Sequence, residues 1–299
     1  MSKEKVTREK VRSAVSELDD ETFVKTTETW PVEITSIYEA PPSLRGTLSS
    51  KQGFVKAAYV PGERMMFRRK PSLALAAYTD GLAHLEVDRG KIKMTFFAMP
   101  EIDFLVSTKR MLSGLLAVAG RSSNDKKAAA VAYNIVRENI FQDILNFWRD
   151  SVFGRQDWGR GDHFNKFSEQ NFKFMNHANA LAGDEIAFEL YEEGINADTE
   201  LLEAYEIEPD KLIFISGREM VVISDPPRSG PEAESVGVSS LHLNLNNVRE
   251  YTLEYESADI LRLTIKFINE LSKMWYFRAT RKSEVEEMMG VAGLKKAQA

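Results

Sequence analysis

The chain has 299 residues, of which 43% are hydrophobic, and this length predicts two or three domains with packed cores. It contains no cysteine, which excludes disulfides, thiolate metal sites and thiol nucleophiles and favours a reducing compartment. A formal net charge of −6, from 39 basic and 45 acidic residues, argues against a chain-wide surface for nucleic acid, so no nucleic-acid partner is expected.

Residues 1–29 form a polar N-terminal segment, in which 1–20 are expected to be a short helix or a frayed tail. The segment lacks the apolar core of a secretory signal, and Ser2 stands where N-myristoylation requires glycine. No stretch of the chain approaches the roughly 20 apolar residues that a spanning helix needs. We therefore expect a cytoplasmic protein, with peripheral membrane attachment through a folded surface as the alternative.

Residues 30–120 are predicted to form a β-rich domain. Alternating or apolar runs bounded by Pro-Gly and Asp-Gly turns predict strands over residues 33–38, 53–60, 64–69, 73–79, 82–87, 91–98 and 102–106. Residues 108–120 (TKRMLSGLLAVAG) are predicted to form a helix, with Thr108 as its N-cap and Gly120 at its end.

Residues 121–183 are predicted to be a helical linker region. Asn124 or Asp125 can cap a helix whose apolar residues recur at helical spacing up to Trp148. A second helix, rich in aromatic residues, is expected to end near Gly183. Its phenylalanines could stack bases, but a stripe facing the core fits the negative net charge better; they are Phe164, Phe167, Phe172 and Phe174.

Residues 184–299 return to strands. Strands are predicted over residues 186–190, 212–215, 220–223, 241–245, 248–255, 261–267 and 274–279. Residues 225–237 have no apolar periodicity and are predicted to be a loop. A final helix is expected to start at Ser283, with Glu286 completing a capping box.

The stretch from about residue 203 to residue 290 resembles a pleckstrin-homology-like (PH-like) domain of the PH/GRAM type. The resemblance is carried by the hairpin LIFISGREMVVIS, the segment LNNVREYTLEY, the strand pair LRLTIKF and MWYFRAT, and the terminal helix, although the family's frequent tryptophan is absent from that helix. It implies a seven-stranded bent sheet closed by one helix, so residues 184–299 are expected to form a PH-like domain. The expected fold class is therefore α+β, with PH-like β-barrels capped by C-terminal helices and a central helical region.

Residues 50–120 show a looser version of the same order. DFLVSTKRMLSGLLAVAG aligns with WYFRATRKSEVEEMMGVAG, since both run from a strand through Thr, Lys and Arg to a predicted helix. An internal repeat and a chance similarity of two strand–cap–helix units both explain this alignment.

A basic cluster lies on or near two predicted strands of the N-terminal domain. It consists of Lys56, Arg64, Arg68, Arg69 and Lys70. In the PH family, basic residues so placed hold inositol phosphates, and the similarity extends to Lys56, Arg68 and Lys70. Guanidinium and ammonium groups suit phosphate because their hydrogen bonds to it are charge-assisted. The alternative is a solvated strand face balanced by Glu63.

No pattern in the chain amounts to a catalytic site, a cofactor cradle or a metal centre. The four histidines form no HExxH pair, and there is no GxxxxGK[ST] loop. Asp157, Asp162 and His163 share one polar loop, an arrangement that is common by chance. We therefore predict no catalytic residue, no cofactor and no metal.

Trp275 and Phe277 point to the same face of a predicted strand. If that face is covered the rings belong to a core, and if it is open they form an interaction surface.

Taken together, these patterns predict a non-enzymatic adaptor or structural subunit whose partner is another protein or further copies of itself. We expect the C-terminal domain to bind through its exposed sheet edge or the groove beside its helix. A peripheral protein that binds anionic phosphoinositide lipids and a self-assembling coat protein are the alternatives, and an enzyme with an unrecognised site stays open.

Overall fold

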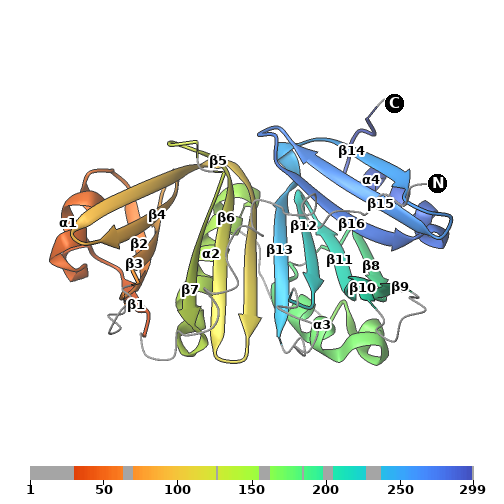
Figure 1. Ribbon diagram of the computed structural model, residues 1–299, viewed down its shortest axis with the longest axis horizontal. Coiled ribbons are helices and arrows are strands. Elements are labelled where there is room, and N and C mark those ends of the chain that lie inside the picture. The colour runs from red at the N-terminus through yellow and green to blue at the C-terminus, as the bar shows by residue number, and fades with distance from the viewer. Residues whose placement is uncertain are drawn as a thin grey trace.

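The computed structural model describes residues 30–62, 70–125, 127–154, 162–183, 185–197, 205–226 and 237–297 (Figure 1). Its helices are α1 (Pro42–Ser49), α2 (Glu138–Phe153), α3 (Ser168–Leu181) and α4 (Lys282–Val291). Its strands are β1 (Val32–Ile34), β2 (Phe54–Val60), β3 (Ser72–Tyr78), β4 (Gly81–Asp88), β5 (Lys91–Arg110), β6 (Ser113–Ser122), β7 (Ala128–Asn134), β8 (Phe188–Glu192), β9 (Ile195–Ala197), β10 (Tyr205–Glu208), β11 (Lys211–Ser216), β12 (Glu219–Ser224), β13 (Val238–Asn244), β14 (Val248–Tyr255), β15 (Ile260–Phe267) and β16 (Ser272–Arg278).

Within the described residues, one antiparallel sheet of eleven strands runs through both halves of the molecule. The link is β5, whose first half pairs with β4 and whose second half pairs with β6 and with β13. The register shifts between Phe97 and Phe104 mark where β5 changes partners. Figure 1 shows the consequence: the N-terminal half, in red to yellow, lies beside the C-terminal half, in green to blue. The fold is therefore mixed, with antiparallel sheets and helices packed on them.

The same order of elements occurs in both halves. In the first, β2, β3, β4 and the start of β5 are followed by the rest of β5 with β6 and β7, and then by α2. In the second, β8, β11, β12 and β13 are followed by the separate sheet β14-β15-β16, and then by α4. Each half thus contains four antiparallel strands, three antiparallel strands and one helix, and the second half also has the two-stranded sheet β9–β10 between β8 and β11.

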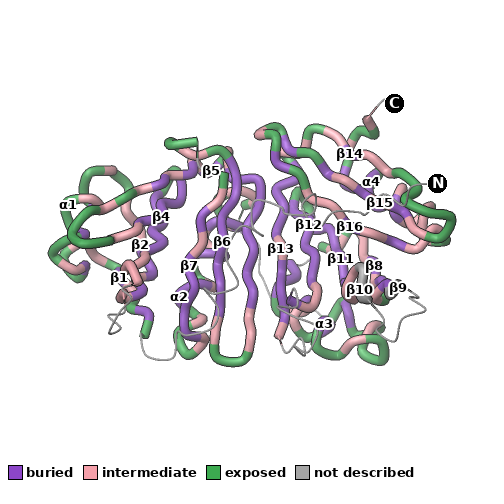
Figure 2. Tube along the Cα trace, in the orientation of Figure 1, coloured by how far each residue is buried: buried purple, intermediate pink, exposed green. Residues whose placement is uncertain are grey.

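Both faces of the central strands are covered, and Figure 2 shows buried residues following one another along β5, β6 and β13. On β6, Leu116 and Val118 pack into a core that also contains residues of α2, whereas Ala117 and Ala119 pack into a core shared with β14–β16 and α4. The strands β11 and β12 lie between α3 on one side and the β14–β16 sheet on the other. Strands buried on both faces are apolar along their length, which explains the runs LIFI and MVVI.

The predicted helix over residues 108–120 is wrong: this segment forms the end of β5 and most of β6. Thr108 is not an N-cap but a buried strand residue whose hydroxyl lies 3.0 Å from the Ser239 hydroxyl of β13. The start of the expected helical region is also a strand, β7, and its helix begins only at Glu138. In each case a run buried on both faces shows no period of two, so pattern alone could not separate strand from helix.

Two helix starts also differ from expectation. Pro42 begins α1, where no helix was predicted from the sequence. A helix can begin at this residue because proline is tolerated in a first helical turn. The last helix begins at Lys282, and its N-cap, Arg281, makes no side-chain cap bond, so the predicted capping box at Ser283 is wrong. The predicted strand over residues 64–69 and most of the predicted loop over 225–237 lie outside the described residues.

The bend in β5 depends on Gly120, which lies opposite it on β6 with a φ of 157°. A Cβ atom at this position would stand 2.1 Å from the Glu101 carbonyl oxygen. Gly120→Ala is therefore expected to lower the free energy of unfolding by about 1–3 kcal/mol, through overpacking against backbone that cannot move aside.

Urea denaturation would measure this change, and Gly46→Ala is the matched control. A Cβ at Gly46, on α1, meets no atom within 4 Å, so this variant is expected to keep or slightly raise stability. Equal midpoints for the two variants would contradict the assignment of Gly120 to a close approach.

Candidate functional site

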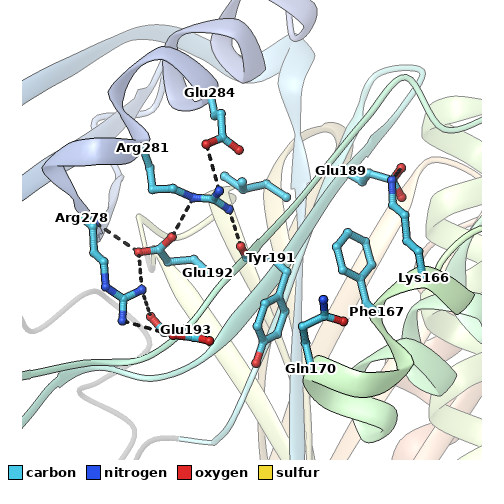
Figure 3. Close-up of a pocket in the computed structure, with 11 residues that line it drawn as sticks. Lys166, Phe167, Gln170, Glu189, Tyr191, Glu192, Glu193, Arg278, Arg281 and Glu284 are labelled. Carbon is cyan, nitrogen blue, oxygen red and sulfur yellow. Dashed lines mark hydrogen bonds and ion pairs between the residues drawn. The ribbon is translucent and has the colours of Figure 1, made fainter.

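A groove of about 620 Å³ opens beside β8, the last strand of the large sheet among the described residues (Figure 3). One wall is the 3-10 turn η5 (Asn165–Phe167) with the start of α3, and the other is the turn η7 (Ala279–Arg281) with the start of α4. The lining residues are Lys166, Phe167, Gln170, Glu189, Leu190, Tyr191, Glu192, Glu193, Arg278, Arg281 and Glu284. Segments more than a hundred residues apart in the sequence thus build one concave surface.

Glu192 anchors the α4 side of the groove and is only 1% exposed. Its carboxylate accepts hydrogen bonds from the Arg278 guanidinium at 3.2 Å and from the Arg281 Nε at 3.1 Å. The backbone N–H of Arg278 donates to the same carboxylate at 3.2 Å. Because the buried charge is satisfied from two directions, β8 and the start of α4 are held together.

Arg281 also fixes the edge of β8. Its Nη2 donates to the Tyr191 carbonyl oxygen at 2.5 Å, and its Nη1 donates to Glu284 Oε1 at 2.9 Å. Figure 3 shows this guanidinium between the two carboxylates that it contacts, Glu192 and Glu284. A planar fork of donors is what lets one arginine bridge two acids and a carbonyl.

The opposite wall is aromatic and less enclosed. The Phe167 and Tyr191 rings lie 6.2 Å apart, and the Lys166 ammonium pairs with Glu189 while standing 5.2 Å above the Phe167 ring. The Tyr191 hydroxyl donates to Asp210 Oδ2 at 2.7 Å, and burial followed by this bond raises the pKa of the phenol. The tyrosine therefore stays neutral and acts as a fixed part of the wall.

The groove contains three cations and four carboxylates, and each described cation contacts a carboxylate. Its charges nearly balance, so it does not present the cationic surface that a polyanion needs. It offers polar and aromatic side chains beside a strand edge, which suits the backbone and polar side chains of another protein. None of these residues was predicted to line a groove, and Phe167 was expected to face a core. The available signal was the pair Arg278 and Arg281 at the junction of a strand with a helix.

The structure describes only part of the predicted basic cluster. Lys56 lies on β2, and its ammonium is 3.4 Å from Asp143 Oδ2 of α2. Lys70 lies just before β3, and Arg64, Arg68 and Arg69 lie outside the described residues. The phosphate site therefore stays a prediction, with Lys56 already in contact with an acid.

The rings of Trp275 and Phe277 belong to a core. Trp275 is 8% exposed and Phe277 is fully buried, in the cluster shared by β14–β16 and α4. The Lys211 ammonium lies 4.7 Å from the Phe277 ring and donates to the Tyr276 carbonyl oxygen at 2.7 Å. Of the two alternatives for these rings, a core and an interaction surface, the burial supports the core, because the sheet face is covered.

A buried ionic group joins the two halves of the molecule. Arg149 of α2 donates to the Glu219 carboxylate of β12 through Nε at 2.8 Å and Nη2 at 2.7 Å, and both side chains are fully buried. His242 of β13 bonds the same carboxylate through Nδ1 at 2.8 Å. Burial would raise the pKa of Glu219, but the Arg149 charge and the His242 bond outweigh it and the pKa is lowered. Burial lowers the pKa of His242, so a neutral imidazole donates to an ionised carboxylate.

A second buried carboxyl lies at the bend of β5. Asp103 is fully buried, and its Oδ1 accepts from the Asn269 amide at 3.0 Å, whereas Oδ2 has no hydrogen bond among the described residues. Burial raises the pKa of Asp103 to about 7 against the effect of the neighbouring Asn269 and Asn247 amides. Asn247 also donates to the Pro100 and Ile102 carbonyl oxygens, so the C-terminal half holds the bend directly.

Neither carboxyl opens onto the groove, and the described residues contain no group of three or more potential ligands that could hold a metal ion. Asp162 and His163 are described, while Asp157 is not. No helix within the described ranges has the length and apolar character to cross a membrane.

Comparison with known proteins adds no assignment to this geometry: no family model matches the chain, and no curated protein matches its sequence.

Proposed function

We propose that the chain is a non-enzymatic adaptor or structural subunit built from two PH-like units, over residues 54–153 and 188–291. The repeated order of four strands, three strands and a closing helix supports this proposal. The resemblance of the C-terminal third implied seven strands closed by one helix, and the N-terminal half contains the same number of strands when α2 is taken as its closing helix. A duplication of one unit accounts for both copies more simply than two separate origins do.

The two units are fixed relative to each other, which favours a rigid scaffold rather than two modules that act independently. The units share the backbone ladder between β5 and β13 and the buried Arg149–Glu219 pair. Such contacts resemble a domain interior more than the small, polar interfaces across which domains move. A partner that touches both units would thus meet a surface of constant shape.

The observation that carries the proposal is the groove beside β8. It combines a strand at the end of a sheet, an aromatic wall and nearly balanced charges, and these features suit a protein ligand. The residues described as lining it include no serine, threonine or histidine. Function through contact, with the groove as the docking surface, follows from this set of side chains.

The test is the native mass of the full chain, tagged and isolated from the cells that produce it, with any protein that co-purifies in fixed ratio. Gln170 is exposed and lines the groove, so Gln170→Arg places a bulky charge at its rim. We expect this variant to weaken the complex at least about tenfold, a change of about 1.4 kcal/mol in binding free energy.

Asn176→Arg is the matched control, because Asn176 is an exposed amide on the same helix and does not line the groove. It should leave the complex intact. A monomeric native mass without a partner, or equal loss with both variants, would count against the groove as the docking surface.

A further inference from the structure

The outer edge of β14 is occupied by the chain's own residues 294–297. In the three-stranded sheet β14 pairs only with β15, so its other edge faces no strand of that sheet. There the Tyr251 N–H donates to the Lys295 carbonyl oxygen at 3.0 Å, and the Ala297 N–H donates to the Tyr251 carbonyl oxygen at 2.8 Å. The two segments run parallel, with Tyr251 opposite Lys296. A short extended peptide is thus bound by the backbone of a strand edge.

Gly293 turns the chain onto this edge. The helix α4 ends at Val291, and Gly293 follows with a φ of 68°, in the left-handed region that glycine adopts without strain. The N–H of Leu294 then donates to the Met289 carbonyl oxygen at 3.0 Å. This turn directs the next residues back along β14, between the strand and the helix.

Two side chains recognise the peptide. Leu294 is half-buried and packs against the core that contains Tyr251 and Met289. The Lys296 ammonium lies 3.2 Å from Glu286 Oε1 of α4, and these side chains are 50% and 40% exposed. The site therefore has one apolar contact and one acid, spaced for a leucine and a lysine two residues apart.

Few contacts hold residues 294–297 in place. They are two backbone bonds to β14, the backbone bond from Leu294 to Met289, one half-buried leucine and an ion pair that solvent screens. A segment held by so few contacts opens readily, and a peptide in trans can then use the same backbone groups.

We propose that the edge of β14 is a binding site for an extended peptide of another chain, with an apolar residue and a basic residue two positions later, and that residues 294–297 are its internal competitor. This deepens the proposed function, on which it rests, by adding a second docking surface and the chemistry of its partner. Binding in trans requires release of the internal segment, so affinity depends on how firmly that segment is held.

The experiment uses a labelled peptide with the sequence of residues 292–297, Ala-Gly-Leu-Lys-Lys-Ala, and measures its binding by fluorescence anisotropy. The protein is the full chain, either unchanged or carrying Ala297→Pro. Proline removes the N–H that donates to the Tyr251 carbonyl and should loosen the internal segment without touching the core. We expect the variant to bind the peptide at least about tenfold more tightly than the unchanged chain. A control peptide should not bind if aspartate replaces its leucine and glutamate replaces the lysine that corresponds to Lys296.

Because the chain has no cysteine, a single introduced thiol locates the bound peptide. Arg249→Cys, on the exposed part of β14, should form a disulfide with a peptide that carries cysteine at the first lysine position. The control Ser272→Cys lies on β16, at the opposite edge of the same sheet, and should not. Absence of binding to both protein forms, or equal crosslinking at both positions, would overturn the proposal. Gln170→Arg should leave peptide binding unchanged, so failure at β14 and failure at the groove are separate results.

Discussion

Replacing Glu219 by glutamine is expected to lower the free energy of unfolding by about 3–5 kcal/mol. The substitution preserves shape but removes the charge that faces Arg149, and both side chains are fully buried. Arg149 cannot shed its proton to escape this cost, since a guanidinium stays charged in proteins. The bond from its Nη2 to the Leu181 carbonyl oxygen at 2.8 Å does not supply an opposite charge.

Urea denaturation at pH 7 would measure the loss, with Glu250→Gln as the matched control. Glu250 pairs with Lys266 at 3.0 Å on the surface, where solvent screens the pair, so this change should cost about 0–1 kcal/mol. The double variant Arg149→Met with Glu219→Leu should recover much of the stability, because no unpaired charge is left in the interior. A loss no larger than that of Glu250→Gln would show that the junction does not depend on the buried pair.

The Arg149–Glu219 pair also shows what the sequence could have revealed. Arg149 follows Trp148 and lies four residues after Leu145, so it shares the apolar face of α2. A charge on such a face predicts a buried partner, but nothing local says where the partner is. Glu219 lies seventy residues later, at the start of β12, and the residues directly after it on this strand are apolar. Only the β5–β13 pairing brings Arg149 and Glu219 together.

Strands of the C-terminal half were predicted well because turns and charged residues separate them. The strands over residues 261–267 and 274–279 were placed within two residues of their ends. By contrast, residues 108–120 were predicted as a helix because β6 is buried on both faces, and burial on both faces removes the alternation that identifies a strand. The closing helix of the first half was consequently sought some thirty residues too early.

A groove beside the last helix was expected, but the residues that line it were beyond prediction for a different reason. Its walls come from η5, β8 and η7, which only the closed fold brings side by side. Charged residues of these segments look like ordinary surface residues in the sequence. Unlike a surface residue, Glu192 is only 1% exposed, but the two arginines that contact it lie more than eighty residues away in the sequence.

Asp103→Asn is expected to stabilise the protein at pH 8 and to change little at pH 4. Burial raises the pKa of Asp103 from 3.8 to about 7. Between these values the unfolded chain has released the proton while the folded protein retains it. The folded state is then the one that binds more protons, so stability falls as the pH rises from about 4 to about 7 and is constant above that range. Asparagine mimics the protonated acid and does not ionise, so the variant escapes this loss, which we place at about 2–4 kcal/mol.

The measurement is the difference in unfolding free energy between Asp103→Asn and the unchanged chain, at several pH values from 4 to 8. Taking the difference cancels groups such as Glu219 that both proteins share. Asp259→Asn, at an exposed position of the β14–β15 turn, controls for the change in net charge. A difference that is the same at pH 4 and pH 8 would show that Asp103 ionises in the folded state as readily as in the unfolded one.

The fall in stability with rising pH follows from the environment of Asp103 at the bend of β5. The amides of Asn269, Asn247 and Asn244 donate to Asp103 or to the carbonyl oxygens of residues 100–102, so these hydrogen bonds to the bend come from uncharged donors. No described cation pairs with Asp103 there, and the nearby Glu101 charge raises its pKa further. A carboxyl in this setting serves the fold as a neutral, hydrogen-bonded group. Its ionisation above pH 7 acts on the segment that carries the large sheet from one half to the other, so the stability of the junction should be greatest on the acid side of neutrality.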